Sequence, residues 1–114
     1  MYVTAAEQKS FAIKTGGALS TTRIYKYPVD GEGVPNQIVC GRVKLLDIQL
    51  QGNQMMCWVE TRDGLPLSTT ELIGFGTGWP IPTEIIGKMK YFKTVQDAAG
   101  FVWHFYELLE GSLA

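Results

Sequence analysis

The middle of the chain carries the pattern that most narrows the possible fold, because it is typical of a tight β-hairpin. Leu46, Ile48 and Leu50 alternate with polar residues, so an extended strand here would have one apolar and one polar face. Gly52-Asn53 follows at once, and a two-residue turn with glycine first predicts a type II′ hairpin. We therefore expect two antiparallel strands joined at this turn.

The returning strand of this hairpin, Gln54 to Thr61, has apolar side chains on both faces. One face carries Met56, Trp58 and Glu60, and the other carries Met55, Cys57 and Val59. A strand that is apolar on both faces is typical of the middle of a sheet that is covered on both sides. The pattern therefore predicts a central, doubly covered strand.

Other short segments rich in β-branched and aromatic residues lie on either side of the hairpin. Strands are expected at Thr21–Tyr27, Ile38–Val43, Thr69–Phe75, Gly87–Val95 and Phe101–Glu107. Within Gly87–Val95, one face would carry Met89, Tyr91, Lys93 and Val95. The predicted fold class is all-β and mainly antiparallel, a small β-sandwich or barrel of about six to seven strands with little helix.

Two segments near the termini fit other interpretations. Glu7–Lys14 fits either a short helical turn or a strand, and Tyr106–Leu113 fits a short helix. Thr15-Gly16-Gly17 would break any element before it, so residues 1–20 are interpreted as a mobile N-terminal extension. Residues 21–114 are interpreted as a single β domain, which is a usual domain size.

Composition and charge exclude several classes of function. Hydrophobic residues make up 46% of the chain and charged residues 18%, which is typical of a globular protein. The net charge is −1, so bulk electrostatics draw the chain neither to a nucleic acid nor to an anionic membrane. No apolar run approaches the ~20 residues of a membrane span, and the N-terminus lacks the pattern of a signal peptide. A cytoplasmic protein with two reduced thiols, Cys40 and a buried Cys57, is therefore expected.

Residues 74–82, "GFGTGWPIP", join two segments with different backbone freedom. The three glycines allow many backbone conformations, whereas the two prolines restrict the backbone to a few. The glycine backbone could cradle an anion, but neither a Lys-Ser/Thr pair nor a helix pattern follows it. The pattern therefore favours a bent strand end, followed by an extended rim that the prolines hold. On that rim Trp79 has two interpretations, a surface contact residue or a cover over the edge of the core. The Trp79–Pro80 bond is also a candidate for a cis peptide.

His104 is the only histidine of the chain and shares a predicted strand face with Val102 and Tyr106. A structural histidine is favoured over a Cys–His dyad with Cys40 or Cys57, because such a dyad needs an exposed thiol with a lowered pKa. The sequence has no ligand spacing for a metal site, and neither a metal nor another cofactor is expected. No catalytic residue is assigned.

Lys88 and Lys90 share a predicted strand face and could line an anion site together with the glycine loop. The alternative is a solvated face that guards a sheet edge. The candidate contacts for a ligand or partner are Gly76, Thr77, Gly78, Trp79, Lys88, Lys90 and His104. The site hypothesis therefore joins the glycine loop to two lysines and the histidine.

The order of several short motifs resembles a family of small bacteriophage-encoded proteins of unknown function. The motifs are Ile24–Pro28, Met56–Val59, Phe75–Pro82, Phe92–Gln96 and Phe101–Glu107. Members of that family carry a K-Y-P start, an F-G-T-G-x-P-I block and a V-W/F-H-V/F-x-E ending. Trp79 stands where the family pattern has a histidine, so no metal or acid–base role is carried to that position. The resemblance implies a phage origin and a sandwich fold, and it implies no particular activity.

Three functions are kept as hypotheses. The first is a non-enzymatic binding protein that acts on a host component, as a host-takeover or anti-defence inhibitor. The second is an oligomeric sponge that sequesters an anionic nucleotide signal, with Trp79 for stacking and Lys88 or Lys90 for phosphate. The third is a structural or assembly protein of the virion, with exposed strands pairing between copies. The expected partner is thus a host protein or a small anionic ligand, and a homo-oligomer would suit the second and third hypotheses.

Overall fold

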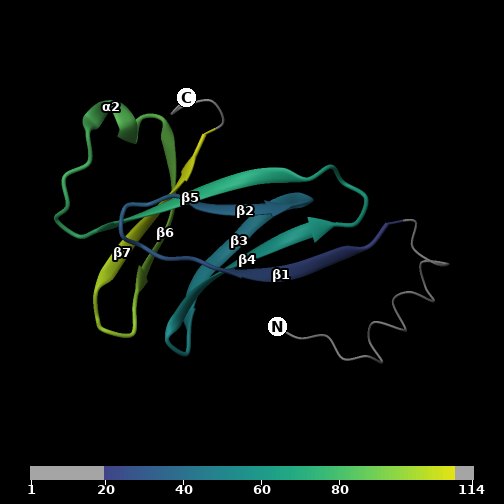
Figure 1. The fold of residues 1–114 in the computed structure, drawn as a ribbon, viewed down its shortest axis with the longest axis horizontal. Coiled ribbons are helices and arrows are strands. Elements are labelled where there is room, and N and C mark those ends of the chain that lie inside the picture. The colour runs from purple at the N-terminus through teal and green to yellow at the C-terminus, as the bar shows by residue number, and fades with distance from the viewer. Residues whose placement is uncertain (1–19, 110–114) are drawn as a thin grey trace.

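The computed structural model describes residues 20–109, and strands dominate this part of the chain (Figure 1). The strands are β1 (Thr22–Pro28), β2 (Asn36–Cys40), β3 (Arg42–Gln51), β4 (Gln54–Arg62), β5 (Ser68–Gly76), β6 (Met89–Gln96) and β7 (Val102–Leu108). A single turn of helix, α2 (Thr83–Ile86), lies between β5 and β6. Within the described residues, no helix is long and apolar enough to cross a membrane.

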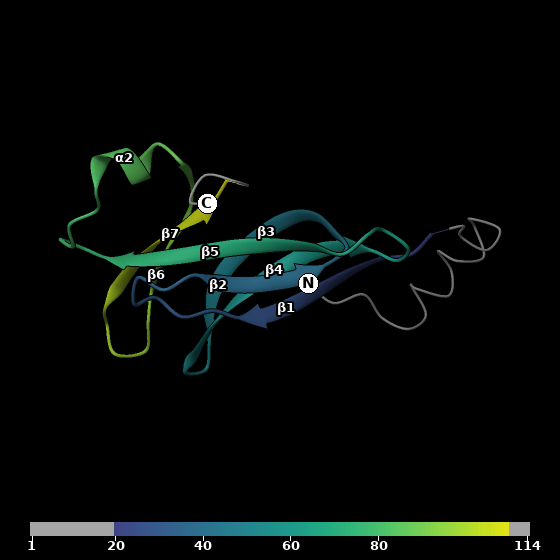
Figure 2. The same cartoon turned by 45° about the horizontal axis from the view of Figure 1, so that its top comes forward.

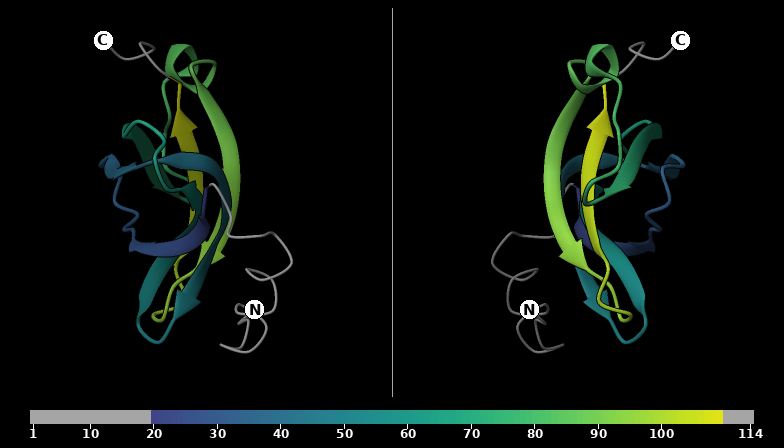
Figure 3. Two further views of the ribbon diagram at one scale, coloured as in Figure 1. Left: turned by 90° about the vertical axis from the view of Figure 1, so that its right-hand side faces the viewer. Right: turned by 90° about the vertical axis from the view of Figure 1, so that its left-hand side faces the viewer.

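The strands form two antiparallel sheets that pack face to face (Figure 2). The three-stranded sheet has the order β1-β4-β3, and the four-stranded sheet has the order β2-β5-β7-β6. At one side of the sandwich β3 lies beside β6 (Figure 3). Lys93 of β6 and Asp47 of β3 form an ion pair there, at 3.0 Å. The prediction of a small, antiparallel, all-β sandwich is therefore confirmed.

The core lies between the two sheets and draws on both. Its fully buried side chains are Phe105, Ile48, Leu72, Val29, Val59 and Cys57. Tyr27, Leu45, Phe92 and Trp103 pack around them and stay partly exposed. Since each strand sends alternate residues inward, burial of these side chains sets the register of both sheets.

The hairpin predicted in the middle of the chain is present with the predicted turn. Gln51 pairs with Gln54, so two residues form the loop, and Gly52 has a φ of 63°. Asn53 keeps a negative φ, which distinguishes a type II′ turn from type I′. The predicted face of β3 is wrong in one place. A β-bulge between Leu45 and Asp47 makes Leu46 the extra residue, so Leu45 takes the inward position instead.

Strand β4 is central in its sheet, as predicted, but only one of its faces is covered by the described residues. Met55, Cys57 and Val59 are buried against the other sheet. Met56 and Trp58, on the opposite face, are only half-buried. The prediction of cover on both sides is not met within residues 20–109, because this part of the chain forms two layers and leaves Met56 and Trp58 partly exposed.

The strand predicted at Ile38–Val43 is two strands in two different sheets. The chain leaves β2 at Gly41 and enters β3, and the Arg62 N–H donates to the Gly41 carbonyl at 2.9 Å. A Cβ at Gly41 would lie 2.9 Å from the Arg62 carbonyl oxygen. Glycine therefore permits the close backbone approach at which the chain crosses between the sheets.

The predicted face of β6 is also interrupted by a bulge. Tyr91 pairs with Tyr106 and Lys93 pairs with Phe105, so Phe92 is the extra residue. Tyr91 therefore lies on the outer face of the sheet, whereas Lys93 and Val95 lie on the inner face. The predicted helix at Tyr106–Leu113 was wrong for Tyr106–Leu108, which belong to β7. Leu109 follows β7 outside any helix, and residues 110–113 of that segment, like the predictions for residues 1–19, lie outside the described residues.

Candidate functional site

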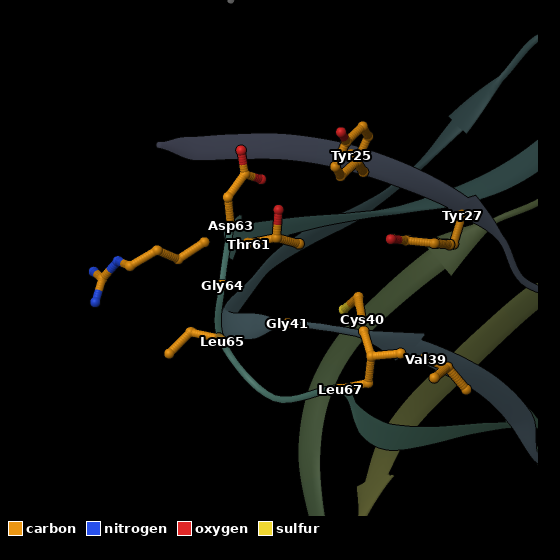
Figure 4. A pocket seen from close by; sticks show the side chains of 11 residues that line it. Tyr25, Tyr27, Val39, Cys40, Gly41, Thr61, Asp63, Gly64, Leu65 and Leu67 are labelled. Atoms are coloured by element: carbon orange, nitrogen blue, oxygen red, sulfur yellow. The ribbon is translucent and has the colours of Figure 1, made fainter. Parts of the chain in front are cut away.

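The two sheets are open to each other along the side formed by β1 and β2. Each of these is an edge strand of its sheet, and the opening between them has a volume of about 340 Å³. We call this opening the edge cleft, and it is lined mainly by Tyr25, Tyr27, Val39, Cys40, Leu65 and Leu67. Figure 4 shows Tyr25 and Tyr27 on β1 facing Val39 and Cys40 on β2 across the opening.

Within residues 20–109, no strand pairs with the outer edge of β1, so the backbone groups along that edge lack a strand partner. The Val29 N–H donates to the Met55 carbonyl at 3.0 Å, and the Asp63 N–H donates to the Thr21 carbonyl at 2.8 Å. Because these bonds alternate along an antiparallel ladder, the odd-numbered residues of β1 bond to β4. The N–H and C=O groups that point to the free edge belong to Thr22, Ile24 and Lys26. Pro28, which has no N–H, occupies the next free-edge position, where its missing donor costs no ladder bond.

Strand β2 has a shorter free edge of the same kind. The Gly33 N–H donates to the Gly74 carbonyl at 2.8 Å, which places the carbonyl of Gly74 on the β2 side of β5. Alternate residues of β5 therefore bond to Asn36, Ile38 and Cys40 of β2. The remaining residues, Gln37 and Val39, direct their backbone groups away from β5. Neither of these two residues carries a charge.

Apolar side chains at the edge cleft are unusually exposed. The exposed fraction is 75% for Leu67, 55% for Val39 and 48% for Tyr25. Deeper in the cleft, burial raises the pKa of the Tyr27 hydroxyl, and the neighbouring Cys40 adds to this effect. Exposed apolar groups beside unpaired backbone groups are characteristic of a binding surface rather than of a catalytic centre.

The glycine loop, Gly74 to Gly78, has an architectural explanation. A Cβ at Gly76 would lie 2.7 Å from Nε1 of Trp79, so the indole lies directly over the strand end. Trp79 also packs edge-on against Trp103, with ring centroids 5.2 Å apart. Gly78 has a φ of 85°, which suits glycine in the turn that returns Trp79 over the strand. Trp79 thus covers the edge of the core and still exposes 45% of its surface. Every described peptide bond is trans, so the Trp79–Pro80 bond, a candidate for a cis peptide from the sequence, is trans.

His104 is held on the outer face of the four-stranded sheet by two threonines. Its Nε2 lies 2.7 Å from Oγ1 of Thr77, and its Nδ1 lies 3.1 Å from Oγ1 of Thr94. Tyr91 extends the network with a 2.7 Å bond from its hydroxyl to Thr94. Of the predicted contacts, the structure therefore brings Thr77 and His104 together, whereas the ring of Trp79 packs with Trp103 on the other face of the sheet.

The cysteines lie away from this histidine. Cys57 is fully buried between the sheets, and burial raises its pKa to about 12. Cys40 is also buried and is free of a disulfide. The Cys–His dyad considered from the sequence is therefore not formed, because His104 points outward and both of its nitrogens are hydrogen-bonded. No group of three or more potential metal ligands occurs among residues 20–109.

Lys88 and Lys90 do not lie beside the glycine loop. Lys90 pairs with Glu107 of β7, whereas Gly76 pairs with Trp103 of the same strand. These two β7 positions are four residues apart, which is about 14 Å at 3.4 Å per residue. Lys88 precedes β6 and follows Gly87, the residue that ends α2. Within one protomer, the predicted pocket of glycine loop and lysines is not assembled.

The residues of the edge cleft were missed by the analysis of the sequence. Tyr25 and Val39 belong to correctly anticipated strands, but nothing local indicates that these two strands border one opening. Leu67 carried the best available signal, since a large apolar residue stands there in a turn rich in Gly, Pro and Ser. The cleft depends on which strands pair, and strand pairing is not a local property.

Comparison with known proteins places the chain in a family. No curated protein and no solved structure gives a significant match. One family model does match, over residues 20–112, and its description is "Domain of unknown function (DUF7352)". Since this match covers most of the chain, the protein belongs to the DUF7352 family of uncharacterised domains.

Proposed function

We propose that this domain is a small, phage-encoded, non-enzymatic binding protein that occupies a host protein in the host cytoplasm. The edge cleft is its contact surface, and the cleft is the single observation that carries the proposal. The phage origin rests on the motif order from Ile24–Pro28 to Phe101–Glu107, which resembles small bacteriophage proteins. A host-takeover or anti-defence role is the finer form of this proposal.

The chemistry of the edge cleft suits a protein partner. Its lining is mainly apolar and aromatic, with Thr61, Arg62 and Asp63 also contributing. Its two rims, at Ile24 and Val39, offer backbone donors and acceptors at the spacing of a strand. A polypeptide segment of the partner can fill the apolar opening with side chains and satisfy those backbone groups at the same time. Burying Leu67 and Val39 removes apolar surface from water, which favours association by about 25 cal/mol per Å².

The side chains that could perform covalent chemistry are poorly disposed for it. A thiol with a pKa of about 12, such as that of Cys57, is almost wholly protonated at neutral pH and is a weak nucleophile. The two nitrogens of His104 are each engaged by a threonine hydroxyl. These observations support a role in binding rather than in catalysis.

The test uses a photo-crosslinking amino acid placed at Leu67 during expression in the host. The matched control carries the same group at Phe101, which is similarly exposed at 66%. Because Leu67 precedes β5 and Phe101 lies beyond its other end, the two positions are about 30 Å apart. We expect one host protein to be captured from position 67 and not from position 101.

A second variant, Leu67→Asp, checks that capture reflects affinity. It should abolish copurification of the captured protein while leaving the melting temperature within about 2 °C, because Leu67 is exposed. Equal capture from positions 67 and 101 would contradict the proposal. Capture of a virion protein in place of a host protein would also contradict it, and would support the assembly role instead.

A further inference from the structure

A second hollow lies on the opposite side of the sandwich, where β3 and β6 close the two sheets together. Its volume is about 200 Å³, and we call it the seam pocket. Its lining includes Arg42, Lys44, Lys90, Tyr91, Phe92 and Glu107. Three of these side chains are cationic and one is anionic, in a protein whose net charge is −1.

The single carboxylate of the seam pocket is fully used by the arginine. Arg42 contacts Glu107 through both terminal nitrogens, with Nη2 lying 3.2 Å from Oε1. Its Nη1 also donates to Oγ1 of Thr70 at 2.8 Å. The pair joins β3 of one sheet to β7 of the other and is about three-quarters buried. Such a bidentate pair has a fixed geometry, so it forms a rigid floor for the pocket.

Neither lysine of the seam pocket forms an ion pair with another described residue. Lys90 stands opposite Glu107 in the strand register, yet the carboxylate binds Arg42 instead. Lys44 stands opposite Glu60. Neither ammonium group has a carboxylate within 4.0 Å among residues 20–109. Two like charges beside one hollow repel each other, and an anion placed between them relieves that repulsion.

We propose that the seam pocket binds the phosphate group of a small anionic ligand, with Lys44 and Lys90 as the contacting cations. Tyr91 also lines the pocket, and its ring, about half exposed, lies on the outer face of β6 where Tyr106 and Thr94 hold it. A fixed, exposed aromatic ring beside a phosphate site can stack on a nucleobase. The ligand class is therefore a phosphate monoester, and a mononucleotide would use both the lysines and the ring. This site is independent of the edge cleft and of the host protein proposed to bind there.

The experiment is a titration of the full-length protein, followed by backbone amide resonances at constant ionic strength. The two probes are inorganic phosphate and adenosine 5′-monophosphate, with chloride as the reference anion. We expect saturable shifts at β3 and β6 with both probes, and tighter binding of the nucleotide. Equal affinities would assign the site to phosphate alone and remove the stacking role of Tyr91.

The variants are Lys44→Gln and Lys90→Gln, and the matched control is Lys26→Gln, an exposed lysine outside the pocket. Each pocket variant should weaken phosphate binding about tenfold, since each removes one charge-assisted contact. The control should bind as the unaltered protein does. Shifts that do not saturate, or that weaken equally in the control, would overturn the proposal, because both indicate general charge screening.

Discussion

Gly31→Ala tests whether glycine is required where a side chain packs directly against the backbone. Gly31 is buried in the loop between β1 and β2, beneath the indole of Trp103. A Cβ built at Gly31 would lie 2.4 Å from Cδ2 and from Cε3 of that ring, far inside van der Waals contact. The ring cannot simply move aside, because its Nε1 donates to Oδ2 of Asp97 at 2.9 Å and Trp79 packs against it.

The cost follows from how firmly the indole is held. Overpacking by one methyl group costs about 1–3 kcal/mol, and here the displaced ring would also lose its hydrogen bond. We expect a loss of about 2 kcal/mol in the free energy of unfolding. With an unfolding entropy of about 2.1 cal/mol/K per residue over ~90 ordered residues, the melting temperature should fall by about 10 °C.

Thermal and urea denaturation measure this loss, and Gly87→Ala is the matched control. Nothing lies within 4 Å of a Cβ at Gly87, whose φ of −71° suits any residue. That variant should be neutral or slightly stabilising. The same substitution is also measured in a Trp103→Leu background, because the smaller leucine side chain leaves space for the added methyl group. The cost of Gly31→Ala should shrink by at least half in that background. The reasoning is refuted if Gly31→Ala costs no more than Gly87→Ala does.

Three further predictions concern protonation, thiol access and the hairpin turn. The pKa of Asp97 is held below its usual range by the hydrogen bond from Trp103, so the stability that it contributes is present above about pH 4 and is lost in more acidic solution. The difference in melting temperature between the protein and its Asp97→Asn variant should therefore narrow below about pH 4, and a constant difference would contradict this. Cys40 and Cys57 should both resist Ellman's reagent in the folded protein and react once it is unfolded in urea, whereas rapid reaction in the folded state would contradict their burial. Gly52→Ala forces a side chain into a φ of 63° and should cost about 1 kcal/mol by urea denaturation, so an unchanged midpoint would exclude the turn described.

The hairpin of β3 and β4 could be predicted because its turn and its alternation lie within one short stretch. The bulges at Leu46 and Phe92 could not, because they arise where β3 and β6 bend to close the seam between the sheets. The sequence indicated a bent strand end at the glycine loop, but it could not identify Phe105, far along the chain, as the side chain that packs against Gly74. The edge cleft was beyond prediction for the same reason.

The pairing pattern of the strands limits the order in which strand pairs can form during folding. The β3–β4 and β6–β7 hairpins are local and can close within microseconds. In contrast, β1 skips two strands to reach β4, and β2 skips two strands to reach β5, so both wait for long loops to close. On the ribosome, β1 has no partner until β4 emerges, and β2 has none until β5 does. The two strands that border the edge cleft are therefore each held by a single long-range pairing, so local opening would release them before the central strands.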